Sequence, residues 1–189
     1  MRKLLLAATL VVFGALSSPA IADTYVIDTK GAHASINFRA SHLGFSWLTG
    51  RFDTFTGTFE YDEADPAQSR VSVEIDVASL NSNHAERDNH LRSDDFFDAA
   101  GHPKATFVSK SIKLTGEKTA IITGDLTIRG VTRSVDIETS HVGGGEDPWG
   151  GFRQGFTGTA TITPSEFGMP NPIAQNPVDL VLEVEGIRQ

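Results

Sequence analysis

Hydrophobic and polar residues alternate along most of this chain with the two-residue period of β-strands. The clearest stretch is 71–77, where valine and isoleucine occupy the odd positions and Ser72, Glu74 and Asp76 the even ones. Segment 104–114 changes face partway along, which predicts a strand that contains a β-bulge. Six further strands are predicted over 34–40, 54–61, 122–128, 131–138, 156–162 and 178–184. The pattern therefore predicts about eight antiparallel strands, each with one apolar face.

Strands of this kind bury their apolar faces in either a two-sheet sandwich or a closed barrel. The predicted core faces mix large aromatic residues with Gly57, Gly124 and Gly158. Small residues on a core face leave volume, which either neighbouring rings or a bound molecule must fill. An eight-stranded barrel can hold one small ligand. The Arg129-Gly130 pair predicts a tight hairpin, and the absence of repeats or a linker predicts one domain over 23–189.

One segment, 81–97, departs from the strand pattern and predicts a short helix from Asn83 to Ser93. Asn83 is placed to act as the N-cap, with Glu86 three residues further on. Asp88 is expected to be a solvated side chain, and Leu91 is the one strongly apolar residue within the turns. A short helix inserted into a barrel suggests a plug or a lid, while a surface helix pinned by a few apolar residues is the plainer alternative.

The N-terminus has the pattern of a secretory signal peptide. Arg2 and Lys3 precede the apolar run 4–16, and Ala20-Ile21-Ala22 is a small-x-small cleavage site. The apolar run is short for a membrane span. We therefore expect residues 1–22 to be removed on export.

Composition narrows the function further. Without Arg2 and Lys3 the chain carries 14 basic and 24 acidic residues, a formal charge of −10 that opposes general binding to nucleic acid. There is no cysteine, which excludes disulfides, thiol catalysis and zinc–thiolate sites. Stability must come from packing.

The sequence shows no catalytic constellation. It lacks a Gly-x-Ser-x-Gly elbow, and the glycine-rich stretch 143–151 has neither phosphate-loop spacing nor a following helix. Trp149 is expected to anchor that stretch. The histidines are scattered, apart from His84 and His90 on the predicted helix, where solvated polar side chains are the better interpretation. We expect no enzyme activity, no metal and no cofactor.

Three stretches closely resemble the YceI-like family of polyisoprenoid-binding proteins: 41–50 (SHLGFSWLTG), 83–93 (NHAERDNHLRS) and 124–132 (GDLTIRGVT). The stretches 147–151 and 184–187 look like its signal-bearing periplasmic branch. The resemblance covers essentially the whole mature chain in order. It implies a lipocalin-like, eight-stranded antiparallel barrel with one short helical insertion, located in the periplasm. It also implies a long apolar pore that takes an isoprenoid chain, such as that of a quinone.

Strand parity and this resemblance together predict a set of ligand-binding residues. Phe38, Phe55, Phe59, Phe107 and Phe156 are expected to point into the barrel and line an elongated cavity, because each shares the parity of its strand's apolar face. The rest of the expected set is His42, Phe45, Trp47, Leu91, Phe96, Phe97, Ile122, Leu126, Val135, Ile162, Phe167 and Met169.

The long connection 164–177 carries four prolines together with Phe167, Met169 and Ile173. A loop of this length is more often functional or disordered than idle. We expect this loop and the helix 83–93 to control access to the cavity, with ordinary packing against the barrel end as the alternative.

Three functions fit the sequence. The favoured one is a carrier or store for an isoprenoid or other long-chain lipid. The others are an enzyme acting on a lipid-like substrate and a binding module for a protein, with an interior that is merely a core. Transient membrane contact and a homodimer are left open.

Overall fold

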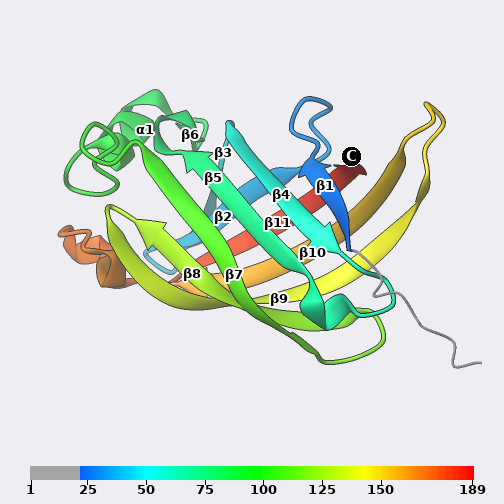
Figure 1. Cartoon of the computed structure of the whole chain (residues 1–189). Helices are drawn as coiled ribbons and strands as arrows, with labels where there is room; N and C mark the ends of the chain where they lie inside the picture. The colour runs from blue at the N-terminus through cyan, green and yellow to red at the C-terminus, as the bar shows by residue number, and fades with distance from the viewer. Residues whose placement is uncertain (1–21) are drawn as a thin grey trace, which may run out of the picture.

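The computed structural model describes residues 22–189, which form one strongly curved antiparallel sheet (Figure 1). The signal peptide predicted over 1–22 lies, apart from Ala22, outside the described residues. The one α-helix among the described residues is α1 (Ala85–Arg92), and four short 3-10 turns are η1 (Pro66–Gln68), η2 (Val77–Ser79), η3 (Pro164–Phe167) and η4 (Pro172–Gln175). The strands are β1 (Asp23–Ile27), β2 (Ser35–His42), β3 (Ser46–Phe52), β4 (Phe55–Tyr61), β5 (Arg70–Asp76), β6 (Leu80–Asn81), β7 (Lys104–Leu114), β8 (Thr119–Ile128), β9 (Val131–Glu146), β10 (Phe152–Ile162) and β11 (Val178–Arg188).

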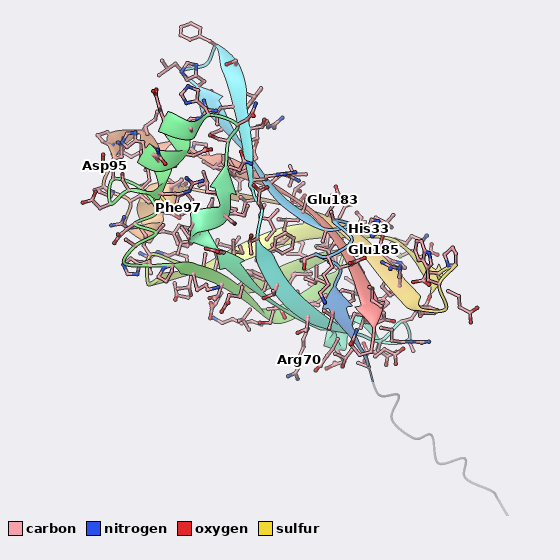
Figure 2. The ribbon with its side chains drawn as sticks, turned by 90° about the horizontal axis from the view of Figure 1, so that it is seen from above. His33, Arg70, Asp95, Phe97, Glu183 and Glu185 are labelled. Carbon is pink, nitrogen blue, oxygen red and sulfur yellow. The ribbon has the colours of Figure 1, made fainter. Side chains whose placement is uncertain are left out.

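Eight of these strands close into a barrel, in the order β1, β4, β5, β7, β8, β9, β10 and β11, with β11 pairing back onto β1. The last strand is shared. Its C-terminal end pairs with β1 from Gly186 to Arg188, and its N-terminal half pairs with β2. From β2 the sheet continues through β3 to β6, and Figure 2 shows the β2–β3 hairpin standing out from the barrel. The predicted eight-stranded antiparallel barrel is confirmed, and β1 and β3 are strands that the alternation did not reveal.

Two local predictions about strand geometry are confirmed. The β7–β8 register shifts between Ser109 and Ser111, which is the bulge that the change of face requires. Arg129 and Gly130 both have positive φ, 52° and 72°, and join Ile128 directly to Val131 across the pair. Two successive positive φ values match the right-handed twist of the flanking strands, which explains why the turn is so tight.

The β9–β10 hairpin is longer than predicted. β9 runs to Glu146, so the glycines at 143–145 lie in a strand and not in a loop. Only 147–151 form the turn, and Trp149 at its tip is 77% exposed. The expectation that Trp149 anchors this stretch is therefore wrong, because the indole ring stays largely in solvent, with the Arg153 guanidinium 5.5 Å from its centroid.

Polar contacts attach α1 to Ser82, directly after β6, which corrects the expectation that its polar residues are solvated. Asp88 is buried and accepts hydrogen bonds from the amide and the hydroxyl of Ser82, the former at 2.8 Å. Arg87 donates to the hydroxyl and the carbonyl of Ser82, at 2.7 and 2.6 Å. The N-cap is His84, whose Nδ1 accepts from the Arg87 amide, and not Asn83, which has a φ of 62° and precedes the cap. A carboxylate whose hydrogen bonds are satisfied in this way can be buried at low cost.

A cluster of apolar side chains seals the barrel at the α1 end. Phe167 of η3 is 1% exposed and Leu80 of β6 is fully buried. Arg129 donates to the carbonyl of Phe96, which fixes the segment after α1 against the β8–β9 turn. Other buried members of the cluster are Phe52, Val77, Met169 and Ala174. Within residues 22–189, no helix is both long and apolar enough to cross a membrane.

Candidate functional site: an apolar cavity in the barrel

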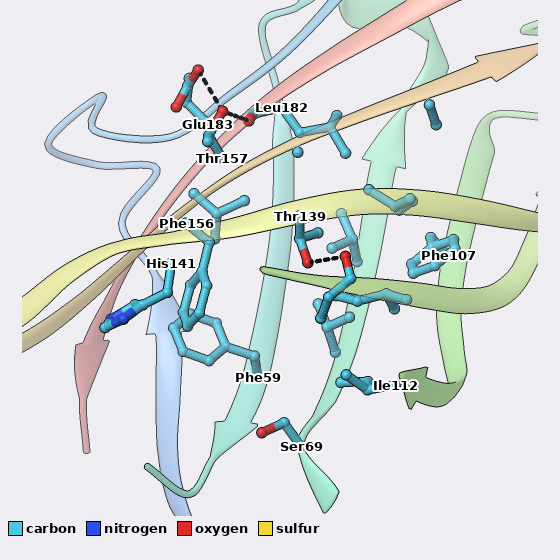
Figure 3. Close-up of a pocket in the computed structure, with 18 of the residues that line it drawn as sticks. Phe59, Ser69, Phe107, Ile112, Thr139, His141, Phe156, Thr157, Leu182 and Glu183 are labelled. Atoms are coloured by element: carbon cyan, nitrogen blue, oxygen red, sulfur yellow. Dashed lines mark hydrogen bonds between the residues drawn. The ribbon is translucent and has the colours of Figure 1, made fainter. Parts of the chain in front are cut away.

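The barrel encloses an apolar cavity of about 220 Å³ between the sealed end and the opposite end (Figure 3). Inward-facing residues from all eight barrel strands line it, because alternate side chains of each strand point to the axis. The apolar lining includes Ile27, Phe55, Phe59, Val71, Val73, Ile75, Phe107, Ile112, Ile122, Leu126, Val135, Ile137, Phe156, Ala160, Leu180 and Val184. No residue of α1, η3 or η4 takes part.

The structure brings seven of the predicted ligand-binding residues together in this lining. They are Phe55, Phe59, Phe107, Ile122, Leu126, Val135 and Phe156. Each lies within a barrel strand that the alternation identified, so strand parity was enough to place its side chain inside. Their role in ligand binding remains a prediction.

The other ten lie outside the lining. Phe96, Ile162, Phe167 and Met169 are buried, and Phe38, Leu91 and Phe97 pack half-buried against the core. The remaining three, His42, Phe45 and Trp47, lie on the protruding β2–β3 hairpin, where no opposing strand covers them. Phe45 is 84% exposed and Trp47 is 56% exposed. His42, Phe45 and Trp47, which were predicted to bind the ligand, are therefore on the protein surface and not in the cavity.

The cavity reaches solvent at the end formed by η1 and the β7–β8 turn, which we call the mouth. Exposed residues line it there, among them Arg70, Leu114, Glu117 and Lys118. Figure 2 shows Arg70 well away from Phe97 and Asp95, which mark the α1 end. The prediction that α1 and 164–177 control access stays untested, but the geometry favours access from the mouth.

An exchange measurement distinguishes the two ends. We expect Leu114→Trp to slow transfer of a lipid between the protein and vesicles, because a larger side chain narrows the mouth. We expect Phe97→Ala to leave the transfer rate within about twofold, since Phe97 does not line the cavity. Faster exchange in Phe97→Ala with no change in Leu114→Trp would place the gate at the α1 end.

An aromatic cluster lies on the mouth side of the cavity. The ring of Phe156 lies 5.2 Å from that of Tyr61, 5.1 Å from His141 and 5.6 Å from Phe59, centroid to centroid. His141 Nε2 lies 2.7 Å from Oε1 of Gln154, which is buried. An amide oxygen only accepts, so Nε2 of His141 is the donor in this contact. Sequence parity pointed to Tyr61 as an inward residue, whereas His141 lies beyond the predicted strand.

A buried charge cluster lies outside the cavity, where the β9–β10 hairpin meets β11 and the loop after β1. The Arg153 guanidinium lies 2.8 Å from an Asp28 oxygen and 2.7 Å from an Asp147 oxygen, and it also pairs with Glu185. Hydrogen bonds from Arg153 and His33 lower the pKa of Asp28 to about 2, and Arg153 likewise lowers the pKa of Asp147.

The same cluster contains a possible metal-ligand triad, Asp28, His33 and Glu185, whose ligand atoms lie within 4.8 Å of one another. Figure 2 shows His33 and Glu185 next to each other. Arg153 donates to both carboxylates, and its guanidinium therefore supplies the positive charge that a cation would bring. The arrangement is that of a structural ion cluster.

The fold and the site define a class of protein: closed antiparallel barrels that enclose an apolar cavity open at one end. The chain belongs to one family within it, since residues 25–186 match the YceI-like domain. It is 49% identical, over the full length of both chains, to a UPF0312 protein of Vibrio parahaemolyticus and to another of Ectopseudomonas mendocina.

Solved structures show the same architecture. BcnA of Burkholderia cenocepacia superposes with a TM-score of 0.75 at 25% identity, covering 84% of this chain and 98% of BcnA. The YceI protein of Campylobacter jejuni gives 0.71 at 29% identity, covering 79% and 90%. A domain from Saccharophagus degradans, described as polyisoprenoid binding, gives 0.65 at 16% identity, covering 90% and 100%, and shows a likeness of fold.

Proposed function

We propose that this protein is a periplasmic carrier or store that holds a long-chain isoprenoid lipid, such as a polyprenyl quinone, in the barrel cavity. The observation that carries the proposal is an apolar cavity sealed at one end and open at the other. The polyisoprenoid-binding description of the Saccharophagus domain supports the same ligand class. The periplasmic location rests on the signal peptide pattern. Membrane contact and a homodimer remain predictions.

The size of the cavity limits the ligand. Pockets that enclose drug-sized ligands usually measure about 300–1,000 Å³, and this cavity holds about 220 Å³. A slender chain lying along the barrel axis fits such a space better than a compact ring system does. A chain longer than the cavity must widen the barrel or extend through the mouth.

The free energy of burying the lipid chain favours a protein that can release its lipid over one that holds it permanently. At about 0.8 kcal/mol per buried CH₂, a chain of roughly 40 carbons would gain about 30 kcal/mol on leaving water, which exceeds the practical limit of about 20 kcal/mol. The relevant competing state is the bilayer, where the chain already lies in hydrocarbon. Packing, chain bending and the head group then decide a small net preference, which allows loading and unloading.

Mass spectrometry of an organic extract of the purified mature protein tests the proposal. A stoichiometric, intact isoprenoid lipid is the expected result. A lipid recovered as a chemically modified product would favour an enzyme. An extract without lipid, together with no uptake from vesicles that contain a polyprenyl quinone, would favour a protein-binding module.

We also expect weak selectivity for chain length. Apolar walls discriminate by about 1–3 kcal/mol per methylene at best, and the part of a long chain that extends through the mouth meets no wall, so lipids longer than the cavity that differ by one isoprene unit should compete with similar affinities. Competition between labelled and unlabelled quinones of increasing chain length measures this. Tight binding of one length, with no binding of its neighbours, would contradict the expectation.

A further inference from the structure

The tip of the β2–β3 hairpin carries three exposed apolar side chains at alternate positions. Leu43, Phe45 and Trp47 are 71%, 84% and 56% exposed. None of them lines the cavity, so the barrel interior does not explain them. Figure 2 shows the hairpin standing out from the barrel, away from Arg70 at the mouth. These side chains therefore face a partner outside the chain or no partner at all.

The backbone of the turn favours the first alternative. The Phe45 amide donates to the His42 carbonyl at 2.9 Å, which makes Leu43 and Gly44 the central residues of the turn, with φ values of 54° and 78°. Two positive φ values in succession favour Asn-Gly, because a residue with a bulky side chain is strained there. Leu43 packs little within the chain to offset this strain. An apolar residue kept in a strained and solvent-facing position indicates a role in binding.

The hairpin also differs in charge from the rest of this acidic protein. No aspartate or glutamate occurs between Asp28 and Asp53, an interval that contains the whole hairpin. Arg39 lies behind the tip, with its guanidinium 4.2 Å from the centroid of the Trp47 ring and 2.9 Å from Asp179. The tip itself carries no negative charge that would repel an anionic surface.

The shape of the tip fits a soft surface better than a rigid one. Its apolar side chains lie on a protruding turn, which a bilayer can accommodate without a matching groove. Apolar faces of interfacial segments enter a bilayer by about 5–10 Å. At about 3.3 Å per strand residue, Arg39 lies roughly 13 Å behind Leu43, at the level of the head groups. Tryptophan is enriched at the same level of a membrane.

We propose that the tip of the hairpin, residues 42–47, inserts into the surface of a phospholipid bilayer. Leu43 and Phe45 enter the boundary between head groups and acyl chains, and Trp47 lies at the head-group level. Ala40 pairs with Val178 at the start of β11, so the tip extends beyond the sealed end of the barrel. Membrane contact through the tip leaves the mouth uncovered. The bilayer is the partner, and the inference does not depend on what the cavity holds.

A substitution with opposite effects on folding and on binding tests the proposal. Leu43→Asn introduces the residue that the turn favours, so thermal stability should stay equal or rise. Its affinity for vesicles of phosphatidylethanolamine and phosphatidylglycerol, measured by flotation, should fall about tenfold because the inserted apolar side chain is lost. Val142→Asn is the matched control, since Val142 is 65% exposed but lies on β9. It should bind within about twofold of the parental protein.

Tryptophan fluorescence shows which part of the protein enters the bilayer. The chain has two tryptophans, Trp47 and Trp149, and both are exposed at hairpin tips. Trp149→Phe leaves Trp47 as the single reporter, whose emission should shift to shorter wavelength and be quenched by lipids with brominated acyl chains. Trp47→Phe leaves Trp149, and its emission should stay unquenched.

Each contrary result has a definite meaning. Absence of vesicle binding by the parental protein, or quenching of Trp149 in place of Trp47, would overturn the proposal. Unchanged vesicle affinity in Leu43→Asn would do the same. Phe45→Ser is the second variant if Leu43→Asn fails to fold, and it should lose affinity to a similar extent. A dimer that Phe45→Ser dissociates, without vesicle binding by the parental protein, would assign the tip to a second copy of the chain.

Discussion

Replacing Ala160 with Phe is expected to weaken lipid binding strongly while the barrel stays folded. Ala160 is 8% exposed, pairs with Leu180 and lines the cavity, so a larger side chain there enters the space that the lipid chain needs. Overpacking a filled core costs about 1–3 kcal/mol, but here the ring has a cavity of about 220 Å³ to occupy. We expect affinity for a polyprenyl lipid to fall by more than about tenfold, which corresponds to 1.4 kcal/mol.

The matched control is Thr159→Phe, one residue earlier on β10 and exposed on the outer face of the barrel. Lipid uptake from vesicles measures loading, and thermal unfolding confirms the fold. If Ala160→Phe folds and loads as well as the control, the lipid is not held in this cavity.

Arg153→Met is expected to destabilise the protein by about 3–5 kcal/mol, the usual consequence of removing one partner from a buried ion pair. Asp28 and Asp147 both depend on Arg153, and their side chains are only 6% and 7% exposed. Without the guanidinium, two nearby carboxylates remain buried and short of a counter-charge. Urea-induced unfolding measures the change in the free energy of unfolding.

Arg188→Met serves as the control for this variant. Arg188 pairs with Asp23 at 3.2 Å, but both side chains are about half exposed, at 43% and 51%. Exposed pairs contribute less than about 1 kcal/mol. A loss of similar size in both variants would show that the buried cluster has no special role in stability.

The stabilisation by this cluster should depend on pH. Hydrogen bonds from Arg153 and His33 hold the pKa of Asp28 at about 2, below its usual 3.8. A carboxyl with a lowered pKa stabilises the fold fully above its unfolded pKa, and the stabilisation is lost as the pH falls through the folded pKa. The stability difference between the parental protein and Arg153→Met should therefore be largest above pH 4 and shrink towards pH 2. A difference that stays constant over this range would exclude the carboxylates as its source.

Strand periodicity predicted the part of the cavity that regular strands build. Phe59 and Phe107 line it because a side chain on a strand can point in only two directions, and the apolar stripe identifies the inner one. Phe45 was predicted from the stretch 41–50, which carries the family resemblance, but it lies at the tip of the β2–β3 hairpin, where strand parity does not show whether a side chain is buried. The exposure of Phe45 depends on how far the β2–β3 hairpin extends beyond the barrel. That extension is set by the pairing of β2 with β11, which is distant in the sequence.

The burial of polar residues could not be predicted from the sequence pattern. Asp88 was expected to be solvated because acidic residues on a short helix usually are, yet it is 7% exposed. Its partner, Ser82, is six residues away in the chain and is itself buried. Nothing in the local pattern shows that both groups are turned inward. Burial of a charge follows from a pairing in three dimensions, and periodicity does not report it.

Because β11 pairs with β1 at one end and with β2 at the other, the strand pairing along this edge of the barrel is interrupted. β1 pairs with it only as far as Ile27 opposite Gly186, and β2 begins at Ser35 opposite Glu183. Between them, a single backbone hydrogen bond, from the Asp28 amide to the Glu185 carbonyl at 2.8 Å, connects the intervening loop to β11. The β1–β11 ladder itself has only three register pairs, from Tyr25 opposite Arg188 to Ile27 opposite Gly186, whereas the neighbouring β10–β11 ladder has ten. The closure of the barrel at this seam therefore depends on a short ladder, the Asp28–Glu185 backbone bond and the ion pairs of Arg153 with Asp28 and Glu185.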